Sequence, residues 1–491
     1  MFEKFKKLYK NIITLNVTLD NYKEEAIVQS LPSVAELNRA KKLIEEGKFD
    51  NACDILNNLS KKDYLAYKYL GNIAEKKSNF VSAVGYYSEC AKLNPNDKDV
   101  WLRLGMTQLY TNNFNSALLS FEQANKITPN NTDVYTGWGM TYMRMKKYAL
   151  ARDKFNTACQ ISKYNYTAIL LSAVMEIRIG EYAIAEEKLR FLVKVAPNES
   201  SNYEYAHLKI IQEKYDEAEI FAKKALEFNS QMLPAYFILS EVYSISKNCE
   251  KTEEVFNKAL EKGLDCAMLR FEWGKAYVRI LEFEKAQEQF KTAIEKDEAC
   301  TDAKIGLALI NSYKDDFVLL DEIKEKHLNN VYIQEAIGIE LFKSSNFQES
   351  VLMFKKALKT DKNQTYNYLN LAKCYEKLND LTRTRENYEK FILENPKYLK
   401  GLIGYSKWLI NISDFEEANR KLKKAIKLSI DNIELLNLLF FTEYTLVKKN
   451  VCEYNIKEAI SVANKALNLG RFDYEPQKQE LESILKDLGQ N

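Results

Sequence analysis

The side chains that could do acid–base or metal chemistry are few and scattered in this chain of 491 residues. Only two histidines are present, His207 and His327, and Glu204 lies three residues before the first of them. A carboxylate-bridged metal centre would need two such Glu-x-x-His pairs on facing helices, and the sequence contains one. We therefore expect His207 to pack inside a helical core and His327 to lie in a solvated turn.

The other common signatures of catalysis are also missing from the sequence. Neither histidine has a thiol or hydroxyl partner at a spacing that suggests an activated nucleophile. No glycine-rich phosphate loop, dinucleotide fingerprint or G-x-S-x-G elbow occurs. Carboxylate pairs such as Glu253–Glu254 fall on polar helix faces. We predict that the chain is not an enzyme, has no catalytic residues, and binds no metal and no cofactor.

The cysteines and the charge balance indicate where the chain works and what it does not bind. Eight cysteines are scattered without a C-x-x-C pair, which predicts reduced thiols in a cytoplasmic protein. Seventy-one basic residues balance 69 acidic ones, so we expect no nucleic-acid partner held through phosphate neutralisation. No run of 18 apolar residues occurs. We do not expect membrane association, for which the basic N-terminal segment with Phe2, Phe5 and Leu8 is the only candidate; a packed helical cap over residues 1–32 is the alternative.

A motif with a period of about 34 residues fills most of the chain. Apolar and small residues recur within it at helical spacing, in two segments of about a dozen residues. A position held largely by Gly, Ala or Ser in the first segment predicts that two helices cross closely there. Alanine marks the matching position of the second segment, and bulky residues are expected to fill the space between pairs. The third copy carries Trp101, Leu104, Gly105, Phe114, Ala117, Phe121, Ala124 and Pro129, and the fourth carries Tyr135, Trp138, Gly139, Tyr142, Tyr148, Ala151, Phe155 and Ala158.

These residues follow the pattern W-x2-L-G-x2-Y…A-x3-F…P, and the chain resembles the tetratricopeptide-repeat family over about nine-tenths of its length. The resemblance implies an all-α fold, a right-handed α-α superhelix (solenoid) of about 13 helix pairs with a C-terminal capping helix. It also implies a non-catalytic protein that binds other proteins. The RNA-binding pentatricopeptide family has a similar helix pair, but its period is 35 residues.

The register of the motif predicts the organisation of the chain. The copies begin near positions 33, 64, 98, 132, 166, 200, 233, 267, 301, 331, 365, 399 and 433. An N-terminal array over 33–300 is followed by a degenerate copy at 301–330, a second array at 331–469 and a capping helix within 470–491. We interpret the degenerate copy, which has Lys324 where an aromatic residue is expected, as a bend. A drifted copy without geometric consequence fits the same residues.

In proteins that resemble this chain, the first helix of each pair lines a concave groove. We predict that this groove binds a peptide or helix of a partner protein, apolar with acidic residues, because methionines adapt to varied shapes and arginines orient carboxylates. Tight packing that hides the same residues is the alternative. The predicted partner-binding residues are Leu102, Arg103, Met106, Leu109, Met140, Met143, Arg144, Leu170, Val174, Ile177, Arg178, Leu208, Phe237 and Phe271.

Beyond position 300 the same line becomes polar. Glu335, Asn370, Lys373, Lys377 and Lys407 replace the apolar residues, which fits either a second binding specificity or surface drift. The sequence therefore predicts a protein-interaction scaffold or adaptor. A structural subunit of a large complex, assembled through self-association, is the alternative, and the oligomeric state stays open.

One specialisation of the family can be checked directly on the residues. Co-chaperones of the family grip a C-terminal carboxylate with a Lys–Asn–Asn–Lys–Arg set spread over three copies. Lys68 and Asn72 match its first two places, but Arg103, Asp133 and Gly137 stand in the other three. We therefore do not expect this carboxylate clamp.

Overall fold

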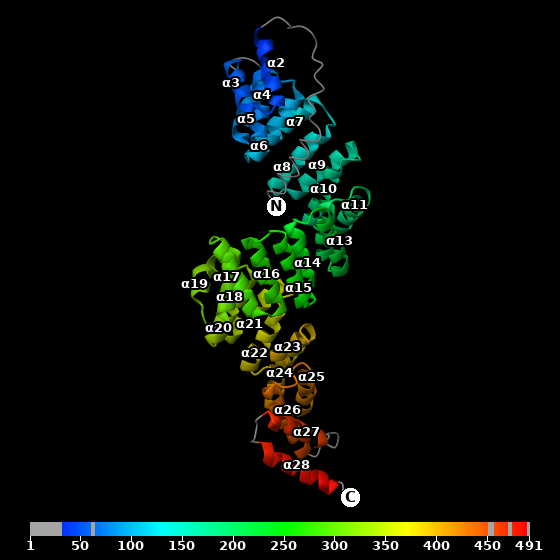
Figure 1. Ribbon diagram of the computed structural model, residues 1–491, viewed down its shortest axis with the longest axis vertical. Coiled ribbons are helices and arrows are strands. Elements are labelled where there is room, and N and C mark those ends of the chain that lie inside the picture. Colours follow the sequence, from blue (N-terminus) through cyan, green and yellow to red (C-terminus); the bar gives the residue numbers. More distant parts are fainter. Residues whose placement is uncertain (1–31, 60–63, 450–455, 470–473, 489–491) are drawn as a thin grey trace. The chain divides into compact units, whose positions relative to one another are not determined.

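The chain forms an all-α solenoid of paired helices (Figure 1). The computed structural model describes residues 32–59, 64–449, 456–469 and 474–488, and these ranges contain 27 α-helices and no strand. The predicted N-terminal cap, with Phe2, Phe5 and Leu8, lies outside them. The chain divides into two compact units, residues 1–208 and 209–491, which we call unit 1 and unit 2.

Successive helices within each unit alternate between the first and second member of a pair. Unit 1 contains α2 (Pro32–Glu45), α3 (Phe49–Leu59), α4 (Tyr64–Lys76), α5 (Phe80–Leu93), α6 (Lys98–Tyr110), α7 (Phe114–Ile127), α8 (Thr132–Arg144), α9 (Tyr148–Ile161), α10 (Tyr166–Ile179) and α11 (Tyr182–Val195). The boundary falls within α12 (Glu199–Ile211).

Unit 2 continues the same alternation to the end of the described chain. Its helices are α13 (Tyr215–Phe228), α14 (Leu233–Ile245), α15 (Cys249–Glu261), α16 (Ala267–Ile280), α17 (Phe283–Lys296), α18 (Thr301–Ser312), α19 (Val318–Ile323), α20 (Val331–Lys343), α21 (Phe347–Thr360), α22 (Tyr366–Lys377), α23 (Leu381–Glu394), α24 (Leu399–Asn411), α25 (Phe415–Ile426), α26 (Ile433–Lys448), α27 (Ile456–Asn468) and α28 (Glu475–Leu488). In both units, each first helix begins within one residue of the start that the motif predicts.

The turn between the two helices of a pair has the same backbone conformation in successive copies. A residue one or two positions after the first helix has a positive φ, for example 58° at Lys146, 87° at Gly180 and 71° at Leu281. This left-handed conformation ends a helix, and glycine adopts it most easily. Most copies place another residue there, so these turns carry a small backbone strain.

The close crossing predicted for each pair is confirmed by the glycine positions. A Cβ atom added to Gly105 would lie 2.8 Å from the ring of Phe121, and one added to Gly139 would lie 2.6 Å from Phe155. Both rings are fully buried. The same glycine–aromatic contact, with the same spacing in sequence, joins Gly71 to Tyr87, Gly274 to Phe290 and Gly338 to Phe354.

The degenerate copy lacks a full second helix. Its α18 is followed by the six-residue α19 and a 3-10 turn at Lys324–Lys326, and α18 packs directly against α20 of the next copy. His327 follows this 3-10 turn, where the sequence placed it, and is half-buried. The irregularity therefore brings two first helices together without an intervening second helix of normal length.

A second irregularity joins copies of unit 2 that are far apart in sequence. The turn between α21 and α22 reaches back to earlier copies: Lys362 forms an ion pair with Glu213, Asp361 lies 3.6 Å from Arg279, and Lys247 Nζ donates to Thr365 Oγ1 over 3.4 Å. The ring of Tyr366 packs against Phe283 and Tyr313 at centroid distances of 5.1 and 5.3 Å. We call this set the clasp: Glu213, Lys247, Arg279, Phe283 and Tyr313 on one side, and Asp361, Lys362, Thr365 and Tyr366 on the other.

Candidate functional site

The predicted groove residues differ in how far they reach the surface. Arg178 is exposed; Leu102, Arg103, Met143, Arg144, Val174, Phe237 and Phe271 are half-buried; and Met106, Leu109, Met140, Leu170, Ile177 and Leu208 are buried. Leu208 closes unit 1, and Phe237 and Phe271 belong to unit 2. Six of the fourteen side chains therefore contribute to packing.

The methionines of α6 and α8 belong to one hydrophobic cluster. Met106 and Met140 are buried with Phe121, while Met143 and Val174 pack against the edge of the same cluster. Because side chains three or four residues apart lie on one helix face, a single face runs from the core to the surface along α8. The half-buried edge is the part of this face that a partner could reach.

Two of the predicted arginines stand beside this edge with partners in neighbouring copies. Arg103 Nη1 lies 2.9 Å from Glu75 Oε2. The Arg144 guanidinium donates to Asn112 Oδ1 over 2.7 Å and lies 5.8 Å from the ring centre of Phe114. These contacts hold guanidinium groups of α6 and α8 at defined positions beside apolar side chains.

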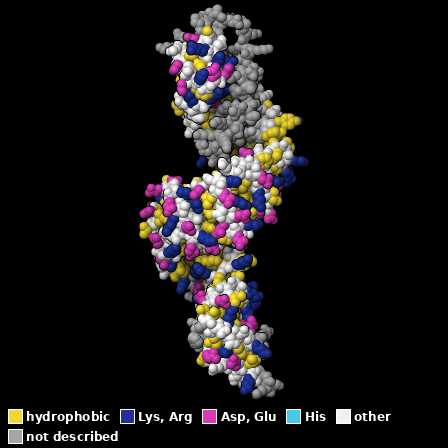
Figure 2. Space-filling model, in the orientation of Figure 1, with side chains coloured by type: hydrophobic (Ala, Val, Ile, Leu, Met, Phe, Trp, Pro, Cys, Tyr) yellow, Lys and Arg dark blue, Asp and Glu magenta, His cyan; other side chains and the backbone are white. Residues whose placement is uncertain are grey.

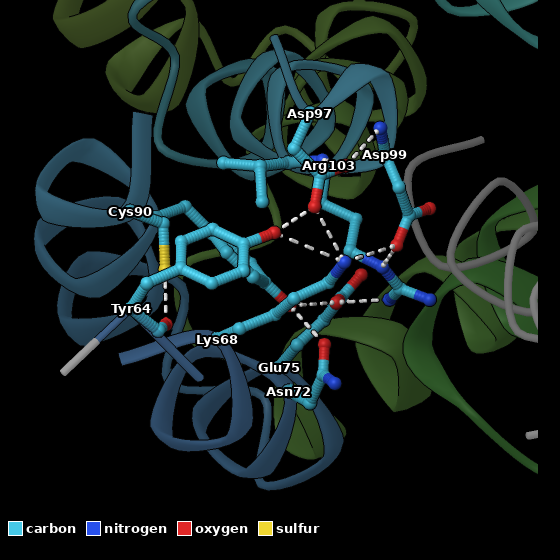
Figure 3. A network of polar contacts seen from close by, with 10 residues as sticks. Tyr64, Lys68, Asn72, Glu75, Cys90, Asp97, Asp99 and Arg103 are labelled. Carbon is cyan, nitrogen blue, oxygen red and sulfur yellow. Dashed lines mark hydrogen bonds and ion pairs between the residues drawn. The ribbon is translucent and has the colours of Figure 1, made fainter. Parts of the chain in front are cut away.

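A network of polar contacts links α4, α5 and α6 at Lys68 (Figure 3). Lys68 is 5% exposed and its Nζ lies 2.6 Å from Asp97 Oδ2, which also accepts a hydrogen bond from the Tyr64 hydroxyl. Burial lowers the pKa of Lys68, and the carboxylate of Asp99 opposes that shift. Pairing with these carboxylates keeps the buried ammonium charged, because an unpaired charge there would be costly.

Asn72, the second residue that matches the carboxylate clamp, is also hydrogen-bonded within the fold. The Tyr87 hydroxyl lies 2.7 Å from Asn72 Oδ1 and 2.9 Å from Glu75 Oε2. A ligand carboxylate at this place would have to compete with Asp97 for Lys68 and would meet the charge of Glu75. The geometry agrees with the sequence in offering no carboxylate clamp at Lys68 and Asn72.

The network includes one thiol. Cys90 donates from its Sγ to the carbonyl oxygen of Tyr64 over 3.4 Å, and burial raises the pKa of this thiol to about 12. The thiolate is the reactive form of cysteine, so Cys90 is inert at neutral pH. Its role in this network is to fill space and donate a weak hydrogen bond.

In unit 2, two residues predicted to make the groove polar are buried instead. Glu335 is 1% exposed and Asn370 is 7% exposed. Glu335 accepts hydrogen bonds from the Tyr313 hydroxyl and from Asn367 Nδ2, the latter over 2.9 Å. Burial raises the pKa of Glu335 to about 7, although both hydrogen bonds act in the opposite direction. The expectation of a groove position was wrong for these two side chains, because both are buried and hydrogen-bonded to the Tyr313 hydroxyl. The side chains of Lys373, Lys377 and Lys407 are exposed.

The histidines do not assemble a reactive centre. His207 is half-buried rather than a core residue; its ring stacks on Tyr203 at 6.3 Å and its Nδ1 lies 3.9 Å from Glu204. Within residues 32–59, 64–449, 456–469 and 474–488, no three His, Cys, Asp or Glu side chains are grouped so that they could hold a metal ion. None of the described helices is both long and apolar enough to span a bilayer.

The repeat motif of this chain matches known protein families. Two family models, both described as tetratricopeptide repeat, match residues 99–131 and 366–398, one segment in each unit. These two segments are tetratricopeptide repeats, and the helix pair that they form recurs along the described chain. Tetratricopeptide repeats are generally a fold that interacts with other proteins.

Individual relatives share parts of the chain or its fold. Hsp70-Hsp90 organizing protein 1 of Glycine max is 25% identical over 180 residues, which cover 34% of this chain and 26% of that relative. The chain thus spans about a quarter of the length of this relative. The structure of the APC/C hetero-tetramer Cut9-Hcn1 superposes with a TM-score of 0.55 at 10% identity, covering 92% of this chain and 96% of that one, which shows a shared fold.

A third protein matches one part of the chain. A tetratricopeptide repeat protein from Parabacteroides merdae is 19% identical and covers 50% of this chain and 98% of its own, with a TM-score of 0.42.

Two features of these sites escaped the sequence analysis. Asp97 caps α6 by accepting from the backbone of Asp99 and Val100, and it also forms the ion pair with Lys68, which the sequence analysis did not predict. The signal that would have predicted this ion pair is a lysine on one first helix followed, 29 positions later, by an aspartate at the start of the next first helix. The clasp has no comparable signal, because its partners are separated by up to 149 residues.

Proposed function

We propose that the chain is a non-catalytic cytoplasmic scaffold that binds a segment of another protein along the first helices α6, α8 and α10 of unit 1. The observation that carries this proposal is the line of half-buried and exposed side chains Met143, Arg144, Val174 and Arg178 on α8 and α10. Apolar and guanidinium groups alternate along it. Six of the fourteen predicted residues are buried in the core. The proposed binding surface therefore consists of the predicted residues of unit 1 that are half-buried or exposed.

The chemistry of this line favours a protein segment with apolar side chains and interspersed carboxylates. Methionine and valine offer adaptable apolar contact, and arginine matches carboxylates with a planar pair of donors. The visible face in Figure 2 carries interspersed basic and acidic side chains without a continuous basic area. With a formal net charge of +2, a nucleic acid is the less suitable partner.

Site-specific photo-crosslinking in the native cell tests the proposal. Benzoylphenylalanine is introduced in place of Met143 or Arg178, and, as a control, in place of Lys194, which is exposed on the second helix α11. We expect the same partner protein to be identified by mass spectrometry from both groove positions and not from the control. Adducts from Lys194 alone would contradict binding along the first helices.

A second candidate function, assembly through self-association, is favoured by the outer face of α11. Ile184, Phe191 and Val195 are 47%, 42% and 49% exposed and recur at spacings of seven and four residues, so they share one helix face. Exposed apolar faces of this kind mark interaction surfaces. Size-exclusion chromatography with light scattering measures the oligomeric state. A dimer that becomes a monomer on Ile184→Lys with Phe191→Lys supports self-association. A monomeric wild type excludes self-association.

A further inference from the structure

A cavity of about 310 Å³ opens between the second helices α21 and α23 of unit 2, with the first helix α22 as its floor. Tyr368, Leu371 and Tyr375 of α22 supply an aromatic and aliphatic base. Lys355 of α21 and Arg383 and Lys390 of α23 stand around it, and Glu386 is the one acid among the lining residues. We call this the α21–α23 pocket.

The pocket lies on the opposite side of α22 from the line of predicted groove residues. Tyr368, Leu371 and Tyr375 follow one another at spacings of three and four, which places them on one face of the helix. The exposed Lys373 is two positions beyond Leu371 and two before Tyr375, and two residues correspond to roughly 200° around a helix. Occupation of the pocket is therefore independent of binding along first-helix faces.

The basic groups around the pocket are poorly neutralised. Arg383 lies 3.5 Å from Asp380, whereas in the described part of the chain neither Lys355 nor Lys390 has a carboxylate within salt-bridge distance. Lys355 Nζ and the Arg383 guanidinium approach the same ring, that of Tyr375, at 5.8 and 5.5 Å from its centre. Like charges brought together from two helices repel one another, and a bound anion would relieve this repulsion.

We propose that the α21–α23 pocket binds an acidic segment of a partner protein in which an apolar side chain stands next to carboxylates. The apolar side chain packs on Tyr368 and Tyr375, and the carboxylates meet Lys355, Arg383 and Lys390. An arginine and two lysines around an aromatic floor suit this combination, since carboxylates pair with the guanidinium and aromatic rings supply apolar area.

The size of the pocket favours a peptide over a nucleic acid. A phosphate backbone is held by a row of cations that follows its regular charges, while this site has three cations around a space for one or two side chains. The neutral balance of the whole chain points the same way.

The test measures binding of a fluorescein-labelled peptide, Gly-Asp-Phe-Glu-Asp-Gly, to the full chain by fluorescence anisotropy at 50 mM sodium chloride. Lys355→Glu with Lys390→Glu reverses two charges at exposed positions, so the affinity should fall about tenfold or more. The matched control, Lys356→Glu with Lys397→Glu, reverses two exposed lysines outside the pocket and should change the affinity less than about twofold.

Further outcomes separate this site from the alternatives. Circular dichroism and an unchanged melting temperature establish that both double variants are folded. Arg178→Glu in unit 1 tests whether the peptide binds along the first helices instead of in the pocket. The proposal is overturned by absence of binding to the wild type, by equal loss in the control variant, or by loss on Arg178→Glu with the pocket variant unaffected. Complete displacement of the peptide by a dT12 oligonucleotide, with the oligonucleotide bound more tightly, would also overturn it.

Discussion

At the scale of single residues, the contact between a glycine of the first helix and a ring of the second sets how closely each pair can pack. A methyl group on Gly105 would lie 2.8 Å from Phe121, a ring that is fully buried and has little room to move. We expect Gly105→Ala to lower the free energy of unfolding by about 1–3 kcal/mol, as overpacked cores do. Urea denaturation followed by circular dichroism measures this change.

The chain provides a matched control for that substitution. Gly85 lies inside α5, and a Cβ added there would have no atom within 4 Å. Gly85→Ala should therefore stabilise the protein by about 0.5–1 kcal/mol through helix propensity alone. If both substitutions shift the transition in the same direction, close crossing is not what selects glycine in the first helix.

Glu335 makes the stability of unit 2 depend on pH. Its pKa in the folded protein is about 7, above the ordinary value of 4.5, because burial among Tyr313 and Asn367 disfavours the charge. A raised carboxyl pKa gives a contribution that is complete below pH 4.5 and is lost as the pH rises to about 7. The stability of Glu335→Gln relative to wild type should therefore increase by roughly 3 kcal/mol between pH 4.5 and pH 8.

Urea titrations of both proteins at several pH values check this expectation. Glutamine preserves the size of the side chain, and its amide oxygen can accept from the Tyr313 hydroxyl, whereas its amide nitrogen cannot accept from Asn367 Nδ2. The lost bond shifts the stability equally at every pH, so a comparison of the pH dependence isolates the ionisation. Glu340, on the same helix and half-buried, provides the control: Glu340→Gln should leave the pH dependence of wild type in place. Parallel stability curves for wild type and Glu335→Gln would show that Glu335 is ionised throughout.

At the scale of elements, the left-handed turn residue connects sequence to stability in each copy. Lys146 has φ of 58°, which is unfavourable for a residue other than glycine. Its side chain is exposed, so packing does not offset this backbone strain. Lys146→Gly should raise the free energy of unfolding by roughly 0.5–1 kcal/mol. Leu281→Gly should lower it, although the backbone strain is relieved in the same way, because Leu281 is buried against Leu369 and Phe391. Thermal denaturation of both variants measures whether the two stability changes have opposite signs.

The helices themselves could be predicted from the sequence, because the copy-to-copy recurrence of small and bulky residues marks each start independently. The exposure of the predicted groove residues could not be predicted from the sequence. Met140 and Met143 lie less than one turn apart on α8, yet the first is buried against Phe121 and the second stays half-exposed. That difference depends on how far adjacent pairs are rotated, a quantity that single-residue patterns do not contain. The predicted limits of the arrays at residues 300 and 330 stay a prediction.

At the scale of the whole molecule, unit 2 departs from a simple row of copies that contact only their neighbours. The clasp joins α12, α14 and α16 to the turn before α22 through ion pairs and ring contacts. Glu335 and Asn370 are buried beside it for the same reason. A periodic sequence predicts neighbour contacts alone, so neither the clasp nor the burial of these polar residues was foreseeable.

This arrangement predicts coupling between distant copies. Tyr366→Ala removes a ring that packs on Phe283 and Tyr313, so it should increase hydrogen exchange in α16 and α17 as well as in α22. The ring of Phe415, which packs on Phe441 of α26 and, within the described chain, on no ring of the clasp, serves for comparison through Phe415→Ala. Mass spectrometry of deuterium uptake would contradict the clasp if Tyr366→Ala affected only α22 and its immediate neighbours.

The clasp also bears on how the chain responds to mechanical load. Stacked helix pairs can lengthen by small, gradual separations, whereas the segment between Glu213 and Lys362 cannot extend until its ion pairs and the Tyr366 contacts rupture. Pulled from both ends, unit 2 should stay short at low force and then yield in one abrupt step, releasing at once the stretch of polypeptide that the clasp holds.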